Sequence, residues 1–419
     1  MKLLIDGRKI GDGGIGVYIE NLIDGLLILQ EKKIADIELS VMVGDNLFHS
    51  LTNIKEAKGN YPAYLRSSGL GSIIDSLKTR WNDKVKFILE TSSKYSFGEY
   101  FMLPYRQKKE ILKHDVYHSP HYTLPFGLGI PSVVTIHDLI HFSHPEIFYH
   151  RPIARQLLKS AIKRAGHIIT VSHESERQIR LLTPEMKTPL TVVPNSLRAS
   201  MKRRTDEEIA EFKKREFFTR PFFLFVGNER PHKGFPDMIQ TWKELSEGDV
   251  LQPCPDLVVV GKHFSQSRDK VSDLNLDHCV RFLGEVSCER LDYLYSAATA
   301  VLVPSKIEGF GLPALESLAM STTVICSDIP ALREVCADAA IYAKKGDTHS
   351  FAVAIIKLLE NRAEYREKIK LGNERVKQFS VEECALKTWN VYTELLGGEK
   401  HITLQGEKTA PPINREASK

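Results

Sequence analysis

The chain has 419 residues, which at about 150 residues per domain favours two domains and allows three. Hydrophobic residues make up 42% and charged residues 26% of the chain, which is typical of globular proteins and excludes a wholly disordered or fibrous chain. The net charge of +4 is too small to indicate a nucleic-acid partner.

The apolar runs are short, and residues 257–260 are among the longest of them. They fall far below the ~18 residues of a membrane-spanning helix, and Asp6 interrupts the first apolar run too early for a signal peptide. None of the six cysteines forms a Cys-x-x-Cys pair. We therefore expect buried thiols in a reducing cytoplasm, with neither a disulfide framework nor a zinc site.

Short apolar runs alternate with amphipathic patterns from the start of the chain, which predicts βαβ units with parallel strands. A first helix is expected from about Val17, because Tyr18, Leu22 and Leu26 form one apolar stripe. The other apolar runs of this half are expected to be strands: 3–6, 38–43, 115–118, 132–136, 167–171 and 190–194. The charged stretch 202–220 has helical content and is expected to be a solvated connector.

The strand pattern then restarts at 222–226, 257–260, 280–283, 300–303, 323–326 and 340–342. We therefore expect an α/β protein of two Rossmann-like, doubly wound parallel-sheet domains that face each other across a cleft, with ligands at the carboxyl ends of the strands. The expected domains are residues 1–200 and 201–379, followed by an amphipathic helix at 380–396. The polar tail 397–419 is expected to be disordered.

Residues 304–316 form the most specific motif. A glycine-bearing loop follows the strand at 300–303, and Pro313 suits the first position of a helix whose free amides would bind a phosphate. Glu308 and Glu316 flank this position, and carboxylates there are better acceptors for hydroxyl groups than ligands for phosphate. The pattern favours a phosphate with a sugar on each side, and a plain loop with turn glycines and a capping glutamate is the alternative.

A second glycine-rich loop, residues 11–16, directly follows the first strand. Glycines let the backbone approach a diphosphate closely, and the start of a helix adds its dipole. The spacing of Gly11, Gly14 and Gly16 does not match Gly-x-Gly-x-x-Gly, so a nicotinamide dinucleotide is not favoured. A simple turn is the alternative.

Arg230 and Lys233 follow the strand 222–226 at its carboxyl end. Two cations facing the Glu308 loop could neutralise the charge of a departing diphosphate, which is the role of a metal ion in other enzymes. Because no Asp-x-Asp motif is visible either, we expect no metal requirement. The alternative is a solvated charged turn.

His137 follows the strand 132–136 and is expected to point into the cleft, where it could contact a sugar hydroxyl or orient a reacting group. The spacing of His137 and His141 also fits a pair of metal ligands, which we do not favour because Pro145 disrupts any long helix. Weaker candidates are His118 and His121.

Residues 61–115 hold ten Lys or Arg and six acids, and this excess equals that of the whole chain. Aromatic residues are interleaved with these charges: Trp81, Phe87, Tyr95, Tyr100, Phe101 and Tyr105. The stretch could rest on anionic lipid at the inner face of the membrane. A solvated helix face is the alternative.

Together these segments resemble the retaining glycosyltransferases of family 4, which have the GT-B fold. The resemblance covers most of the chain and rests on six motifs: residues 13–16, 135–138, 169–172, 193–195, 230–234 and the Glu-x7-Glu element 308–316. Two departures are Asn228, where many members have Arg, and Ser196-Leu197, where Gly-Val is usual.

The resemblance implies a nucleotide-sugar donor held mainly by the second domain and an acceptor held by the first, which helix 380–396 completes. It implies that Glu308 contacts the transferred sugar and Glu316 the ribose, with Lys233, Arg230 and His137 in the cleft. The diphosphate would be held by the backbone of Gly14, Gly16, Phe310, Gly311 and Leu312.

The segment Ile5-Asp6-Gly7-Arg8, with the glycines after it, is similar to bacterial mannosyltransferases of surface polysaccharide synthesis. The resemblance therefore implies transfer of a hexose, with GDP-mannose favoured over UDP-sugars, to a glycan or lipid-linked oligosaccharide and without a cofactor. The alternatives are a UDP-sugar-dependent glycosyltransferase, a GT-B epimerase or sugar phosphorylase, and a non-catalytic sugar- or lipid-binding protein.

Overall fold

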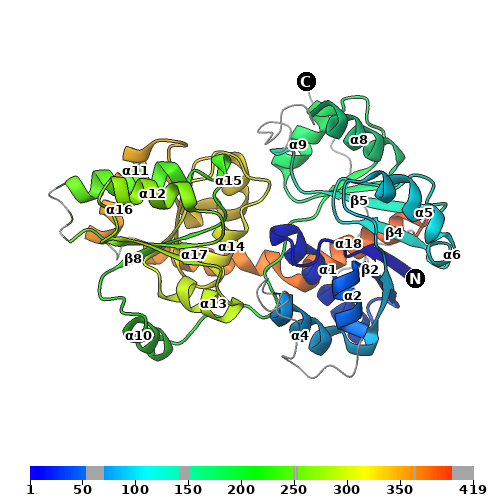
Figure 1. The fold of residues 1–419 in the computed structure, drawn as a ribbon, viewed down its shortest axis with the longest axis horizontal. Coiled ribbons are helices and arrows are strands. Elements are labelled where there is room, and N and C mark those ends of the chain that lie inside the picture. The colour runs from blue at the N-terminus through cyan, green and yellow to red at the C-terminus, as the bar shows by residue number, and fades with distance from the viewer. Residues whose placement is uncertain (53–69, 141–150, 249–250, 252, 362–364, 399–419) are drawn as a thin grey trace.

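The computed structural model describes the chain except for residues 53–69, 141–150, 249–250, 252, 362–364 and 399–419. Most of the expected tail and the proposed metal-ligand partner His141 therefore lie outside the described residues. Figure 1 shows two lobes, each built around its own parallel sheet and covered by helices. This architecture confirms the expected α/β class.

The N-terminal lobe contains a seven-stranded sheet in the order β3-β2-β1-β4-β5-β6-β7, and all neighbouring pairs are parallel. Its strands are β1 (Lys2–Asp6), β2 (Glu38–Val43), β3 (Val85–Leu89), β4 (Val116–Ser119), β5 (Ser132–Ile136), β6 (His167–Thr170) and β7 (Leu190–Val192). The sequence interpretation missed β3. Its exposed Lys86 interrupts the apolar run, because β3 is an edge strand with one side toward solvent.

The C-terminal lobe contains a six-stranded parallel sheet in the order β10-β9-β8-β11-β12-β13. Its strands are β8 (Phe222–Val226), β9 (Asp256–Val260), β10 (Val280–Gly284), β11 (Ala300–Val303), β12 (Thr323–Ser327) and β13 (Ala340–Ala343). All six expected strands are confirmed. The four central strands are largely buried on both faces and appear as continuous apolar runs, and the edge strands β10 and β13 are only partly buried.

The helices cover the sheets (Figure 1). Those of the N-terminal lobe are α1 (Gly13–Glu31), α2 (Asp45–Thr52), α4 (Leu70–Trp81), α5 (Leu103–Arg106), α6 (Lys108–Ile111), α8 (Arg151–Arg164) and α9 (His173–Leu182). Then follow α10 (Asp206–Arg215), α11 (Phe235–Glu247), α12 (Ser265–Asp273), α13 (Cys288–Ala297), α14 (Leu312–Ala319), α15 (Pro330–Cys336), α16 (Thr348–Glu360), α17 (Arg366–Arg375) and α18 (Val381–Leu395). Among the described helices, none combines the length and apolar composition that a bilayer span needs.

Two expectations about helices were wrong in detail. Helix α1 begins at Gly13 and not near Val17, because the glycine-rich loop itself forms the first turn. The helical content expected in the charged connector is present as α10, whose start is closed by a capping box between Thr205 and Glu208, but this helix is not simply solvated. Phe212 of this helix is buried and stacks on Tyr293, so the segment packs on the C-terminal lobe.

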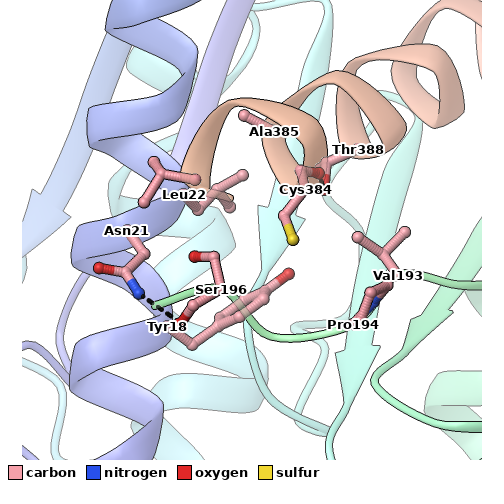
Figure 2. A pocket seen from close by; sticks show the side chains of 10 residues that line it. Tyr18, Asn21, Leu22, Val193, Pro194, Ser196, Cys384, Ala385 and Thr388 are labelled. Carbon is pink, nitrogen blue, oxygen red and sulfur yellow. Dashed lines mark hydrogen bonds between the residues drawn. The ribbon is translucent and has the colours of Figure 1, made fainter. Parts of the chain in front are cut away.

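The last helix, α18, packs against α1 of the N-terminal lobe (Figure 1). The approach is close at Gly25, where a Cβ atom would lie 2.4 Å from Ala385 Cβ. Figure 2 shows the seam where α1 and α18 meet the segment that leads out of β7, and here Asn21 Nδ2 donates to the Ser196 carbonyl at 3.0 Å. The hollow at this seam holds about 10 Å³, room for about one water, so it is a packing seam and not a ligand site.

Candidate functional site

Lys233 and Glu308 form an ion pair, with Nζ of Lys233 2.8 Å from Oε1 of Glu308. The same carboxylate oxygen accepts a hydrogen bond from Ser305 Oγ at 2.7 Å. Glu308 is buried and Lys233 is partly exposed, which leaves the pair open to solvent on the lysine side. The loops after β8 and β11 therefore bring together the two groups that the sequence placed opposite each other.

The backbone explains this pairing. Gly234 has a φ of +70°, and a Cβ atom there would lie 2.2 Å from the Pro304 carbonyl oxygen, so only glycine lets the two loops approach so closely. The amide of Lys306 also donates to the His232 carbonyl at 2.7 Å. Arg230 directly precedes this short turn, and its side chain is exposed.

The Glu308 loop also contacts the N-terminal lobe. A Cβ atom at Gly309 would lie 2.7 Å from the His137 carbonyl oxygen and 2.8 Å from Asp138 Cβ. Ser172 Oγ donates to the Gly309 carbonyl at 2.6 Å, and Ser175 Oγ donates to the His137 carbonyl at 2.9 Å. The two serines therefore join the β11 loop to the end of β5, and sequence reasoning assigned no role to either.

The glycine-rich loop of the N-terminal lobe faces the start of α14. A Cβ atom at exposed Gly14 would lie 3.8 Å from Leu312 Cδ1 of the opposite lobe. Gly16 differs from Gly14, because it is buried and a Cβ atom there would lie 2.7 Å from the Gly11 amide nitrogen. Gly16 thus has a structural reason to be glycine, whereas Gly14 lies at the opening between the lobes.

The helix start expected as a phosphate site is present. Helix α14 begins at Leu312 with Pro313 in its first turn, after Gly311 with a φ of +105°. Leu332 would lie 2.5 Å from a Cβ atom at Gly311, so this turn requires glycine. The ring of Phe310 is buried and packs edge-on against Phe379, which anchors the loop and leaves its backbone amides at the helix start.

Glu316 lies in α14 within a polar cluster. Its Oε2 accepts a hydrogen bond from Tyr295 at 2.6 Å, and its Oε1 lies 3.8 Å from Arg198 Nε. Burial raises the pKa of Glu316, and Arg198 opposes this effect. Arg198 also pairs with Asp292 at 3.0 Å and lines a cavity of about 280 Å³ between the lobes. Arg198 was not predicted from the sequence, although it directly follows the unusual Ser196-Leu197 pair.

His137 lies at the end of β5, where its ring meets Tyr18 edge-on and Nε2 is 3.0 Å from the Pro120 carbonyl. That contact makes Nε2 the donor, and burial lowers the pKa of the ring, so the neutral form is favoured. His118 is fully enclosed and bonds to Tyr392 of α18 at 2.6 Å, and burial lowers its pKa to about 3. His118 is therefore a packing residue.

A buried charged cluster lies at the carboxyl end of β1. Arg8 Nη2 donates to Asp6 at 2.6 Å and to Glu99 at 2.8 Å. Burial alone would raise the pKa of Asp6, but the Arg8 guanidinium lowers it well below its usual range. Asp6, Glu99 and His121 are spaced closely enough to hold a metal ion, yet Arg8 already supplies the positive charge, so we assign no metal there.

The basic stretch 61–115 is only partly a surface, which corrects its interpretation as a single face. Trp81 and Tyr100 are buried, and Arg80 pairs with Glu20 and Asp24 of α1. Residues 61–69 lie outside the described part. Exposed basic side chains occur from Lys84 onward, and the aromatic side chains that face solvent lie between residues 95 and 105.

Two family models match the chain. "Glycosyltransferase Family 4" matches residues 78–199, and "Glycosyl transferases group 1" matches residues 206–375. One match falls in each lobe, and together they span well over half of the chain.

Among curated proteins, the chain is similar to "O-antigen chain mannosyltransferase RfbU" of Salmonella typhimurium, with 34% identity over 57% of this chain and 63% of that protein. It is also similar to "O-antigen chain mannosyltransferase B" of Escherichia coli, with 28% identity over 67% and 74% of the two chains. The match thus spans less than two thirds of the Salmonella protein.

Among solved structures, HepE of Anabaena in complex with UDP-glucose superimposes with a TM-score of 0.71 over 94% of this chain and 100% of that chain, at 14% identity. The sucrose-phosphate synthase of Thermosynechococcus elongatus gives a TM-score of 0.70 over 94% and 99% of the two chains, at 19% identity. These likenesses establish the GT-B fold. The chain therefore belongs to the group 1, family 4 glycosyltransferases.

Proposed function

We propose that this chain transfers a hexose, with mannose favoured, from a nucleotide-diphosphate sugar to a glycan or lipid-linked oligosaccharide in surface polysaccharide synthesis. The observation that carries the proposal is the contact between Lys233 and Glu308, a cation and a buried carboxylate held at the carboxyl ends of β8 and β11. The names of the two mannosyltransferase relatives support mannose as the sugar.

The donor lies between the lobes in this proposal. Its diphosphate binds the amides at the start of α14 and the backbone near Gly14, because a helix start combines free N–H groups with the positive end of a dipole. Glu316 accepts from the ribose and Glu308 from the hydroxyls of the transferred sugar. Lys233 and Arg230 neutralise the charge that builds up on the departing diphosphate.

The reaction proceeds by front-side displacement with retention of configuration. The bond between the anomeric carbon and the phosphate oxygen breaks, the acceptor oxygen bonds to the same face, and its proton moves to an oxygen of the departing diphosphate. A double displacement would need a carboxylate nucleophile on the opposite face of the sugar. In this proposal Glu308 binds the sugar hydroxyls, and Lys233 and Ser305 hold one of its oxygens. Two cations replace the metal ion.

GDP-mannose is the favoured donor, and UDP-sugars are the second candidate. The second candidate is supported by the structural neighbour HepE, which was solved with UDP-glucose and with UDP and glucose. We place the reaction in the cytoplasm, at the inner face of the membrane, with residues 61–115 as the contact region.

The test is a donor screen on the purified protein. GDP-mannose, UDP-glucose, UDP-galactose and UDP-N-acetylhexosamines are compared for hydrolysis and for the thermal shift that each nucleoside diphosphate causes, because a ligand that binds only the folded state raises the melting temperature. We expect GDP-mannose hydrolysis and a shift with GDP but not with inorganic phosphate. A shift with inorganic phosphate alone would indicate a phosphorylase.

The metal-free mechanism is tested in the same assay. Turnover is expected to survive a chelator, and loss of turnover that magnesium or manganese restores would overturn this part. A Lys233→Ala variant serves as the control for hydrolysis by a contaminant.

A further inference from the structure

Exposed apolar side chains gather in one short segment of the N-terminal lobe. In the described part of the chain, ten large apolar side chains are exposed, and six of them lie between residues 95 and 112: Tyr95, Phe97, Phe101, Met102, Tyr105 and Leu112. Phe97 and Tyr105 are 70% and 78% exposed. Isolated exposed apolar residues are common on proteins, but such a concentration is typical of a binding surface.

Two of these rings are in contact with each other. The Phe97 ring stacks on Phe101 with centroids 4.7 Å apart, and Phe101 stacks on Phe126 at 4.9 Å. The turn Gly98–Met102 and the short helices α5 and α6 present them, while Leu103 and Ile111 of the same segment point into the core. The segment is therefore anchored from beneath, and its outer face is left to solvent.

The same face is basic. Arg106, Lys108, Lys109 and Lys113 are all exposed. Two of the four are paired with acids, Arg106 with Glu90 and Lys113 with Glu110. The other acid of the segment, Glu99, is buried on Arg8. Lys108 and Lys109 form no ion pair with any residue that the structure describes. We call the five residues Phe97, Phe101, Met102, Tyr105 and Leu112, with these four basic residues, the apolar–basic strip.

The chemistry of the strip distinguishes between partners. Lysine is depleted at protein–protein interfaces, whereas lysine beside exposed aromatic residues fits a bilayer, where rings enter the headgroup region and cations meet anionic lipid. The segment also starts at the cleft, because Lys94 pairs with Asp12 in the glycine-rich loop. From there it runs to α5 and α6 at the edge of the lobe away from the C-terminal lobe (Figure 1).

We propose that the apolar–basic strip docks the protein on an anionic phospholipid bilayer. This proposal narrows the membrane contact from residues 61–115 to the apolar–basic strip. It rests on the proposed function in one respect: docking would serve to capture a lipid-linked acceptor. Docking itself depends on the strip alone.

The test is cosedimentation of the full chain with vesicles of phosphatidylcholine, with or without phosphatidylglycerol. We expect binding to the anionic vesicles only, and weaker binding at high salt, because salt screens the lysines. Two double variants are expected to weaken vesicle binding at least tenfold. One combines Phe97→Ser with Tyr105→Ser, and the other combines Lys108→Glu with Lys109→Glu.

Each double variant has a matched control. Leu181→Ser combined with Leu371→Ser replaces two exposed apolar residues outside the strip. Lys344→Glu combined with Lys345→Glu reverses two adjacent exposed lysines of the C-terminal lobe. Neither control is expected to change vesicle binding. No binding to anionic vesicles, or equal binding by strip and control variants, would overturn the proposal. A dimer in solution that Phe97→Ser with Tyr105→Ser dissociates, without vesicle binding, would assign the strip to a second copy and also overturn it.

Donor hydrolysis separates this proposal from the proposed function. All strip and control variants are expected to hydrolyse GDP-mannose at the wild-type rate. Vesicle binding without any donor hydrolysis would support docking and refute the proposed function. Donor hydrolysis without vesicle binding would support the proposed function and refute docking.

Discussion

Replacing Arg8 with Met tests the buried cluster at the end of β1. The Arg8 side chain is 3% exposed and donates to both Asp6 and Glu99, which are themselves at most 1% exposed. After the replacement, Asp6 keeps the Tyr117 hydroxyl at 3.2 Å and Glu99 keeps Thr123 Oγ1 at 2.9 Å, but neither keeps a cation. Removing one partner from a buried ion pair costs about 3–5 kcal/mol, so we expect a loss of that size at about pH 8.

The loss is expected to depend on pH. Burial already raises the pKa of Glu99, and without Arg8 burial also raises that of Asp6, so the folded variant binds protons that the unfolded chain has released. Stability then falls as pH rises, because the folded state holds the extra protons. The cost is therefore expected to be smaller at about pH 5 than at about pH 8, where both carboxylates must ionise.

The assay is urea denaturation followed by tryptophan fluorescence in a Trp242→Phe background. Trp81 and Trp389 both lie in the core of the N-terminal lobe, so the remaining signal reports on that lobe. Arg80→Met is the matched control: its pairs with Glu20 and Asp24 are more exposed, and we expect a loss of about 1 kcal/mol or less. An Arg8→Met loss no larger than that of the control, or one independent of pH, would refute the ionised cluster.

Three further predictions concern the site. Lys233→Ala is expected to lower turnover about 100-fold or more with an unchanged circular dichroism spectrum. Its control is Lys270→Ala, which replaces an exposed lysine on α12 and should leave turnover unchanged. Wild-type kinetics in both variants would remove Lys233 from the mechanism. Glu316→Ala is expected to weaken GDP binding about tenfold or more in calorimetry, because a charged hydrogen-bond acceptor is lost, and an unchanged affinity would exclude the ribose contact. Gly309→Ala is expected to keep GDP binding but to lose turnover, because the new Cβ would lie 2.7 Å from the His137 carbonyl oxygen and separate the lobes. Gly44→Ala, which meets nothing within 4 Å, is its control, and equal activity of the two variants would contradict the need for this approach.

The sequence by itself determined the class of fold and the position of the main motif loops. Strands such as β9 and β11 are buried on both faces, so each appears as an uninterrupted apolar run that local pattern can detect. The loop before α14 was equally local, because Gly311 and Pro313 encode the start of a helix within a few residues.

Only the tertiary structure decided which side chains meet and which remain in solvent. Lys233 and Glu308 are 75 residues apart and meet because their loops follow the neighbouring strands β8 and β11. Arg8 and Glu99 are 91 residues apart, and the strands that precede them, β1 and β3, are separated by β2, so their contact depends on how the segment after β3 folds back over the sheet. The aromatic residues of the basic stretch look alike in sequence, yet Tyr100 faces the core and Phe97 faces solvent. Such differences arise from the turn and helix faces on which the residues fall, and local composition does not specify them.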